Sequence, residues 1–449
     1  MSQVQATTYL EPHTKPSKIT ATKLGWTICI LAAVFYCYEY LLRIAPAAMV
    51  PELREAFQLD ATAFGALISL YYLVYTPMQA VVGLAHDLYG PKRMLTLAVF
   101  TCVVGSLLFG LSTTTELAAV GRLLMGFGSA FAFVGAMKLA AVWLPGNRFA
   151  MFAGAITALG MIGGMFGNIF MAVFVEKISW QQTYFIGAAS GLVLMLFVWL
   201  IVKDHPSHVK TQPQTGKHVK VSYRETFHGI YMMVKTPQMW IAGIVACGLY
   251  LSLSGFAELW GNSFVEKVYG FSVSDAATAN SMVFFGWLIG APLMGLLSDH
   301  FKRRRLPLIL TAIAALIVSV LMLTWTQPTF YTACTLLFLF GLFTSAEVIC
   351  FALGRENAAP ELAGTAVAFV NLIVMAGGLI AQPLIGKLLD HYWSGELMAD
   401  GVRTYGSSDF QHAMVILPVG CVIALVCAFF LHETKTELRG KSVKASLKS

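Results

Sequence analysis

Four polar and charged side chains interrupt the first long apolar segment of the chain. At spacings of i, i+3, i+4 and i+7, they are Tyr36, Glu39, Tyr40 and Arg43. This spacing places all four on one face of a helix. A guanidinium stays charged and offers a planar fork that matches a carboxylate, so Arg43 is predicted to bind the carboxylate of a solute. The alternative is that Glu39 and Arg43, four residues apart, neutralise each other and bind nothing.

Ionisable side chains are rare in the other apolar segments, where each is costly and is therefore a candidate for function. In chain order they are Arg122, Lys138, Glu258 and Glu347. Burial disfavours the charged form of a carboxyl group, which is the property that proton coupling needs. Glu39, Glu258 and Glu347 are therefore the candidates for proton coupling, and the sequence does not rank them. For Arg122, near the end of its segment, both snorkelling to the membrane interface and a gating role remain open.

The signs of these charges differ between the two halves of the chain. Arg43 and Lys138 lie in the first half, whereas Glu258 and Glu347 lie in the second. A cavity with opposite signs on its two walls suits a zwitterion such as an amino acid or a dipeptide. A monocarboxylate or a sugar acid would need only the basic wall, with a glutamate left for protons. Further residues predicted to line the cavity are Tyr36, Tyr40, Tyr75, Tyr250 and Asn371.

The composition is that of a membrane protein. Of 449 residues, 57% are hydrophobic and 12% are charged, against about 25% charged in soluble domains. A helix of roughly 20 apolar residues spans the hydrocarbon of a bilayer, and the fold class is therefore predicted to be all-α with twelve transmembrane helices. The predicted spans are 25–49, 63–85, 94–112, 117–141, 149–174, 182–202, 239–263, 277–298, 306–325, 329–354, 362–389 and 412–431.

The basic residues indicate how the chain is oriented. Most of the 30 Lys and Arg residues lie in segments that are cytoplasmic if both termini are cytoplasmic, as the positive-inside rule requires. This topology accounts for the net charge of +7, so nucleic acid is not a predicted partner. The predicted location is the plasma membrane, or the inner membrane of a bacterium. The predicted parts are a cytoplasmic tail (1–23), two six-helix bundles (24–202 and 237–432), a cytoplasmic linker (203–236) and a basic cytoplasmic tail (433–449).

The linker itself is polar and contains Pro206 and Pro213. Its last part, Tyr223–Val234, is predicted to form a short amphipathic helix on the membrane surface.

The two halves repeat a pattern of glycines and charges. A segment after the second span, Gly83 to Asp87, matches Gly295 to Asp299 after the eighth. Adjacent glycines in the fifth span, at positions 163 and 164, are echoed in the eleventh at positions 377 and 378. Paired halves of this kind are typical of transporters whose site lies between the repeats near the midplane.

The segment from Gly83 to Arg93 resembles the loop signature of the major facilitator superfamily, G-x-L-a-D-r-x-G-r-r. The segment from Arg122 to Gly128 is similar to the R-x-x-x-G-x-G motif of that family's fourth helix. The resemblance implies that the loop signature and its repeat latch the cytoplasmic side closed. The latch residues are Gly83, Asp87, Gly90, Lys92 and Arg93 in the first copy, and Gly295, Asp299 and Arg303 in the second. Leu88 stands where the family has a basic residue, and Lys302 replaces the second glycine of the second copy.

The resemblance also implies a mechanism. Two pseudo-symmetric six-helix bundles would rock about a central site in a secondary transporter that works by alternating access and is driven by protons. Helices one and seven of the family meet on the external side, so Arg43 and Glu258 are predicted to form an outer gate. Lys138 and Glu347 lie on the helices that meet on the cytoplasmic side, but their depths differ by about 9 Å.

The predicted substrate is a small polar solute that bears a carboxylate: an amino acid, a dipeptide or an organic anion. Residues Tyr40 to Arg43, followed by Pro51, are similar to the organic-anion symporters, and Lys138 before Trp143 is loosely similar to bacterial relatives of the lysosomal dipeptide carrier. Drug or metabolite efflux is an alternative, which the absence of proline from Gly160 to Gly164 disfavours. A sensor or scaffold that resembles a transporter is a further alternative.

An enzyme is not predicted, because the sequence contains no Ser/His or His/Asp/Glu cluster and no phosphate-binding G-x-x-x-x-G-K-[ST] loop. None of the eight cysteines lies in a CxxC or Cys/His cluster, so no metal and no cofactor are predicted. The predicted partners are the lipid bilayer, a small solute and protons, and a monomer is the state that the resemblance implies.

Overall fold

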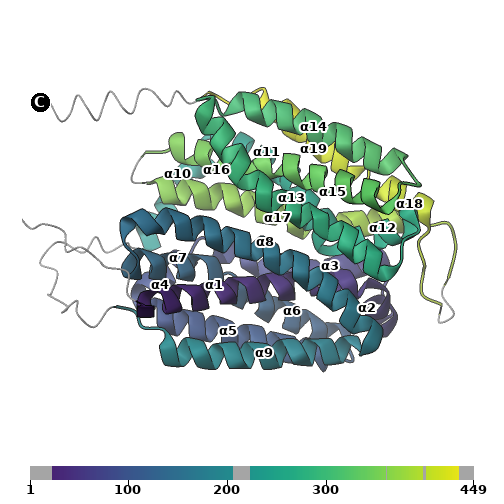
Figure 1. The fold of residues 1–449 in the computed structure, drawn as a ribbon, viewed down its shortest axis with the longest axis horizontal. Coiled ribbons are helices and arrows are strands. Elements are labelled where there is room, and N and C mark those ends of the chain that lie inside the picture. The colour runs from purple at the N-terminus through teal and green to yellow at the C-terminus, as the bar shows by residue number, and fades with distance from the viewer. Residues whose placement is uncertain (1–22, 206–222, 360–361, 398–400, 434–449) are drawn as a thin grey trace, which may run out of the picture.

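The computed structural model describes residues 23–205, 223–359, 362–397 and 401–433. Twelve helices of the described residues are long and apolar enough to cross a membrane, which confirms the predicted count and the all-α class. The helices form two layers, one from each half of the chain, and most of them run along the long axis of the molecule (Figure 1).

The first half supplies the lower layer of Figure 1. Its elements are α1 (Lys23–Ile44), η1 (Ala45–Ala48), α2 (Val50–Phe57), α3 (Ala61–Met78), α4 (Val82–Tyr89), α5 (Pro91–Gly110), α6 (Thr115–Ser129), α7 (Ala132–Trp143), α8 (Gly146–Lys177) and α9 (Trp180–Ile201).

The second half supplies the upper layer. Its elements are α10 (Tyr223–Val234), α11 (Pro237–Leu251), η2 (Ser252–Trp260), α12 (Gly261–Tyr269), α13 (Val273–His300), α14 (Arg305–Thr324), α15 (Phe330–Thr344), η3 (Ser345–Glu347), α16 (Val348–Glu356), α17 (Ala363–His391), α18 (Ser407–Ala413) and α19 (Ile416–Ala428). The helix predicted over Tyr223–Val234 is thus present as α10, and it packs against α11 and α17.

We call the two ends of the bundle the linker face and the opposite face. The linker face is the end at which α9 stops and α10 begins, and the opposite face carries η1, α2, α12 and α18 (Figure 1). Five spans that start at the opposite face begin with a side chain that accepts a hydrogen bond from the first turn of its own helix, which is how Ser, Thr and Asp cap helices. These caps are Asp60, Thr114, Ser179, Ser272 and Thr329.

Several predicted spans are not continuous α-helices: the first ends in η1, the fourth divides between α6 and α7, the tenth contains η3, and the twelfth divides between α18 and α19. The second and the seventh are also interrupted. The second is divided into α3 and α4 by three residues that follow Pro77, a residue that lacks a backbone donor. The seventh contains the π-helix η2 between α11 and α12 and continues to Tyr269, beyond its predicted end at residue 263. A π-helical segment inside a span often marks a functional site, and Glu258 lies in this one.

Contact between the halves runs through α3 with α17 and through α8 with α13. The paired glycines make this contact close: a Cβ added to Gly164 would lie 2.7 Å from the ring of Phe284, and one added to Gly378 would lie 2.9 Å from that of Tyr72. Each of these aromatic residues comes from the other half. Gly164 and Gly378 therefore allow the two halves to pack closely.

The opposite face is closed by further contact of η1 with η2 and α12. Within the described residues, α4 and α7 at the linker face form no comparably broad contact with the second half. The halves therefore meet most extensively toward the opposite face.

Candidate functional site

The site begins on α1, whose polar face is buried. Glu39 is fully buried and Arg43 is 3% exposed. The Nη2 atom of Arg43 donates to both carboxylate oxygens of Glu39, at 3.1 and 3.2 Å, and its Nε atom donates to the hydroxyl of Tyr71 at 3.2 Å. The Tyr71 hydroxyl in turn donates to Glu39 at 2.8 Å. The pairing of Glu39 with Arg43, which the spacing left open, is therefore present.

A second carboxylate reaches Arg43 from the other half of the chain. Glu258 lies on η2, and its Oε1 atom is 3.9 Å from Nη1 of Arg43. Glu258 accepts hydrogen bonds from the hydroxyls of Tyr72 and, at 3.4 Å, Tyr250. The two residues predicted to form an outer gate are thus in contact across the two halves.

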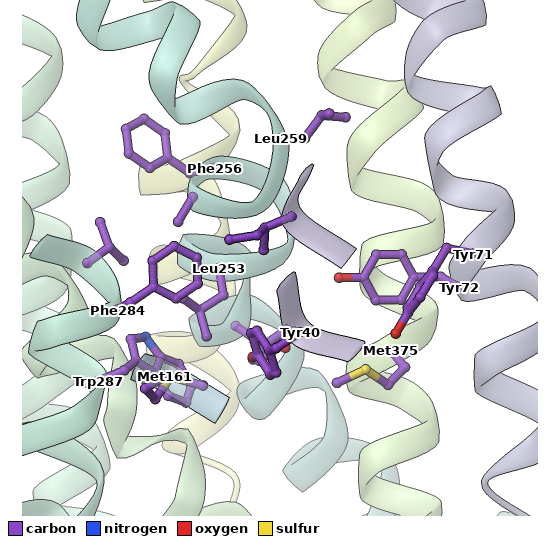
Figure 2. Close-up of a cluster of buried hydrophobic side chains, with 14 of the residues drawn as sticks. Tyr40, Tyr71, Tyr72, Met161, Leu253, Phe256, Leu259, Phe284, Trp287 and Met375 are labelled. Carbon is purple, nitrogen blue, oxygen red and sulfur yellow. The ribbon is translucent and has the colours of Figure 1, made fainter. Parts of the chain in front are cut away.

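Aromatic rings surround the guanidinium of Arg43. Its central carbon lies 4.4 Å from the ring centre of Tyr40, 5.0 Å from that of Tyr75 and 5.3 Å from that of Tyr71. Tyr40, Tyr71 and Tyr72 are among the buried side chains drawn in Figure 2. Ring faces are negative and attract cations, most strongly where water is excluded. Arg43 is therefore held as a buried cation between two carboxylates and three rings.

Arg122 does not snorkel to the membrane interface. It is 1% exposed and donates to the backbone carbonyl of Ile68 from Nε at 3.3 Å and from Nη2 at 3.1 Å. Its Nη1 atom donates to the carbonyl of Leu42 at 3.3 Å, and its guanidinium lies 5.1 Å from the ring centre of Tyr71. Arg122 thus ties α6 to the backbones of α1 and α3 next to Arg43.

Glu347 is placed differently from the other two buried glutamates. It lies in η3, is 2% exposed, and has no hydrogen-bond or ion-pair partner among the described residues. Because an unpaired buried charge is costly, Glu347 differs chemically from the carboxylates that share Arg43.

Lys138 lies away from this cluster. It forms an ion pair with Asp87, and neither side chain is buried. Both line a cavity of about 550 Å³ in the first half, at the linker face, together with His86. Burial lowers the pKa of His86 to about 4. Lys138 therefore meets the loop signature rather than Glu347, which agrees with the difference in depth expected between them.

Two further predicted cavity residues form no hydrogen bond to Arg43 within the described residues, and they lie in different surroundings. Tyr36 is half-buried, with its ring centre 5.8 Å from that of Tyr40. Asn371 on α17 donates to the side chain of Gln79 at the end of α3, at 3.5 Å, and so joins the two halves. Their contact with a solute stays a prediction.

The first loop signature adopts a tight turn between α4 and α5. Gly90 has a φ of 83°, which explains the glycine. A carboxylate oxygen of Asp204 accepts from the backbone N–H of Lys92 at 2.8 Å, and the Lys92 ammonium lies 5.0 Å from the ring centre of Trp199. Gly83 has open space around it and Arg93 is exposed. In this conformation the described signature residues contact their own half, and the latch stays a prediction.

The second copy repeats the turn without the glycine. Lys302 stands at the position of Gly90 and also has a positive φ, of 52°. Asp299 pairs with Arg304 at 2.5 Å, and the latch role of Arg303 stays a prediction. Arg304 also binds Glu356 at 2.7 Å. The backbone of Arg303 bonds to Ser298: its carbonyl accepts from the Ser298 hydroxyl at 3.0 Å, and its N–H donates to the Ser298 carbonyl at 3.3 Å. Gly295 lies in open space like Gly83.

Neither Tyr71 as a partner of Arg43 nor Tyr72 as a partner of Glu258 was identified from the sequence. The sequence does contain a feature that could have indicated these tyrosines. Tyr71, Tyr72 and Tyr75 occupy one stretch of a single span, and Tyr71 and Tyr75 share a helical face. Position in sequence does not say which neighbouring helix that face meets.

Known proteins resemble this chain along most of its length. A family model described as Major Facilitator Superfamily matches residues 28–382 and 262–448. The membrane sensor protein UhpC of Escherichia coli is 24% identical over 84% of this chain and 90% of its own length. The probable sulfoacetate transporter SauU of Cupriavidus necator is 24% identical, covering 81% and 87% of the two chains. The galacturonate transporter of Dickeya chrysanthemi is 25% identical, covering 62% and 84%.

The fold is also that of solved structures. A bacterial homologue of the human lysosomal transporter Spinster, in an inward-facing and unoccupied conformation, superposes with a TM-score of 0.76 over 92% of this chain and 98% of that one, at 15% identity. At this identity the likeness extends to the fold alone.

Proposed function

We propose that this chain, which belongs to the major facilitator superfamily, carries a small organic anion across the membrane together with protons. Membership rests on the family model, which spans both halves. The chain is therefore a multi-pass membrane transporter and not an enzyme. The substrate class and the coupling to protons are the proposed part.

The single observation that carries the anion proposal is the environment of Arg43. It is a buried cation at the contact between the halves, and its charged partners are carboxylates. The Glu258 contact, at 3.9 Å, is longer than a charge-assisted hydrogen bond of about 2.8 Å. A carboxylate or sulfonate of a solute could therefore replace Glu258 at Arg43 and form the shorter bond.

Two relatives support the same class of solute. They are named for sulfoacetate and galacturonate transport, and both solutes are small organic anions. A zwitterion would need a free acidic group opposite Arg43, but Glu258 already engages Arg43 and two tyrosines. Lys138, the second basic residue of the predicted wall, pairs with Asp87 at the linker face. The arrangement therefore favours an anion over an amino acid or a dipeptide.

Glu347 is the proposed proton carrier. An ionised carboxylate at this position would have no counter-charge among the described residues, so we infer that it is protonated in this conformation. Opening of the linker face to water would stabilise the charged form and release the proton. Glu39 and Glu258 instead share the positive charge of Arg43.

The proposed setting follows from the charge pattern of the sequence. With both termini cytoplasmic, the linker face is cytoplasmic and the closed opposite face is external. The protein would act as a monomer in the plasma membrane, or in the inner membrane of a bacterium.

The first test measures the thermal stability of the purified protein with galacturonate, sulfoacetate, alanine or dialanine. A ligand at 100 times its Kd stabilises the native state by about 2.7 kcal/mol. We expect the two anions to stabilise the wild type and Lys138→Gln, but not Arg43→Gln. Arg43→Lys keeps the charge, loses the fork and should bind more weakly. Stabilisation by dialanine alone, or an undiminished response of a folded Arg43→Gln, would overturn the proposal.

The second test measures uptake and proton movement in proteoliposomes. The wild type should acidify the lumen as it takes up the anion, and Glu347→Gln should bind the anion while losing the acidification. Binding without any uptake by the wild type would instead indicate a sensor, the role for which UhpC is named.

A further inference from the structure

The N-terminus of α3 is capped by residues from both halves of the chain. Asp60, directly before the helix, accepts from the backbone N–H of Ala63 at 2.8 Å. Asp390, near the end of α17 in the other half, accepts from the backbone N–H groups of Ala61 at 3.4 Å and Thr62 at 2.8 Å. The first three amides of α3 are therefore satisfied, one by its own half and two by the other.

The carboxylate of Asp390 is held by several donors. It accepts from the hydroxyl of Thr62 at 2.5 Å, from the hydroxyl of Tyr405, and from Nη1 of Arg403 at 3.3 Å. The backbone N–H of Ala61 also donates to the hydroxyl of Tyr405 at 3.0 Å. Asp390 is half-buried, with 13% of its side chain exposed, so these bonds are only partly open to water.

Neighbouring contacts bring the same two segments together. Gly386, one helical turn before Asp390, lies so close to α3 that an added Cβ would be 2.1 Å from the carbonyl oxygen of Ala61. On α2, Arg54 donates to the carbonyl of Arg403 at 2.7 Å, and its guanidinium lies 4.6 Å from the ring centre of Tyr405. These contacts all join the first half to the second at the opposite face.

The chemistry of a helix end makes the cap on α3 depend on whether the two halves are in contact. The first four N–H groups of a helix have no partner within it, and their combined dipole favours a negative charge. If the halves separate at the opposite face, the amides of Ala61 and Thr62 lose the carboxylate that caps them. The amide of Ala63 keeps Asp60, because both belong to the first half.

We propose that Asp390 holds the opposite face closed by capping α3 across the two halves. Asp60 caps the same helix in every conformation and so favours none of them. Asp390 caps it only when the opposite face is closed and so stabilises that state alone. It is a gating residue for transport that does not touch the solute.

The test compares Asp390→Ala with Asp60→Ala. Spin labels at Glu55 on α2 and Lys267 on α12, both exposed on the opposite face, report the separation of the halves by pulsed electron resonance. In every variant the partly exposed native cysteines are replaced by alanine; these are Cys37, Cys247, Cys334 and Cys427. The measurement is made without solute, so its outcome does not depend on the proposed anion.

Asp390→Ala should raise the ratio of open to closed molecules about fivefold or more, as expected for the loss of a helix cap. Asp60→Ala should lower the melting temperature without changing the label distances. If Asp390→Ala does not fold, Thr62→Val and Tyr405→Phe each remove one donor to the carboxylate and should produce smaller shifts in the same direction. Unchanged distances in Asp390→Ala, or an equal shift in Asp60→Ala, would overturn the proposal.

Discussion

A buried pair of asparagines also joins the two halves toward the opposite face. Asn168 on α8 donates to the Oδ1 atom of Asn262 on α12 at 3.0 Å, and Asn262 donates back at 2.8 Å. Asn168 also donates to the carbonyl of Ala277 at 3.2 Å, and Asn262 donates to the carbonyl of Ala47 at 3.1 Å. All four bonds join the first half to the second and must break when the opposite face opens.

Asn168→Ala should therefore shift the conformational equilibrium. It removes both bonds of the asparagine pair and the bond to Ala277, and it leaves one N–H of Asn262 without a partner in the closed state, although Ala47 and Asn280 still bind Asn262. A typical hydrogen bond contributes about 1 kcal/mol, and an unsatisfied buried group costs about 1 to 3 kcal/mol. A loss of about 2 to 3 kcal/mol from the closed state alone raises the ratio of open to closed molecules about 30- to 150-fold.

The matched control is Asn280→Ala. Asn280 donates to the carbonyl of Ala257 at 3.0 Å and to Asn262 at 2.7 Å, and all three lie in the second half. Its loss should destabilise the open and closed states alike. The assay is the distance between spin labels at Glu55 and Lys267. An Asn168→Ala protein that folds and keeps the wild-type distances would refute the reasoning, as would equal shifts in the two variants.

Gly164→Ala should slow transport about tenfold or more, because the added methyl group would lie 2.7 Å from Phe284 of the other half and overpacking costs about 1 to 3 kcal/mol. Gly154→Ala on the same helix meets no atom within 4 Å and should leave uptake unchanged; equal rates in the two variants would contradict the steric argument. Between pH 7 and 4 the folded protein should lose stability through His86. Its pKa of about 4 in the folded state lies below the usual 6.5, so the unfolded state binds more protons, and the loss is about 3 kcal/mol. In His86→Gln this part of the pH dependence of chemical unfolding should disappear, and an unaltered profile would contradict the assignment.

The spans could be predicted because lipid imposes a length on apolar helices. All twelve are present, and the differences lie at their ends and at interruptions within several of them, including those after Pro77 and at η2. The break at Pro77 has a local signal in the proline itself. The π-helix has none that a single sequence reveals, since the residues from Ser252 to Trp260 would also suit an α-helix. Which form they adopt depends on the partners that bind the freed carbonyls, such as Gln382, which donates to the carbonyl of Ser254 at 3.1 Å.

The candidate site was predictable where charge and depth coincide in one span. Glu39 and Arg43 share a face of α1, and Glu258 lies at a similar depth in the seventh span, so both contacts of Arg43 follow from spacing and from the resemblance. Lys138 shows the limit of this reasoning. Its position within an apolar segment suggested a cavity residue, but its partner is Asp87 of the loop signature, and the sequence separates those two residues by an entire span.

Asp390 shows why the remaining contacts could not be read from the sequence. It lies at the end of a predicted span, where an acidic residue is expected to face water, and nothing local distinguishes it from a solvated side chain. Its role depends on the backbone amides of Ala61 and Thr62, and backbone groups carry no residue-specific signal. The sequence does contain Gly386, which allows α17 to approach the carbonyl of Ala61. A glycine one turn before an acidic residue at a helix end indicates a close approach, but only the fold identifies the helix that it meets.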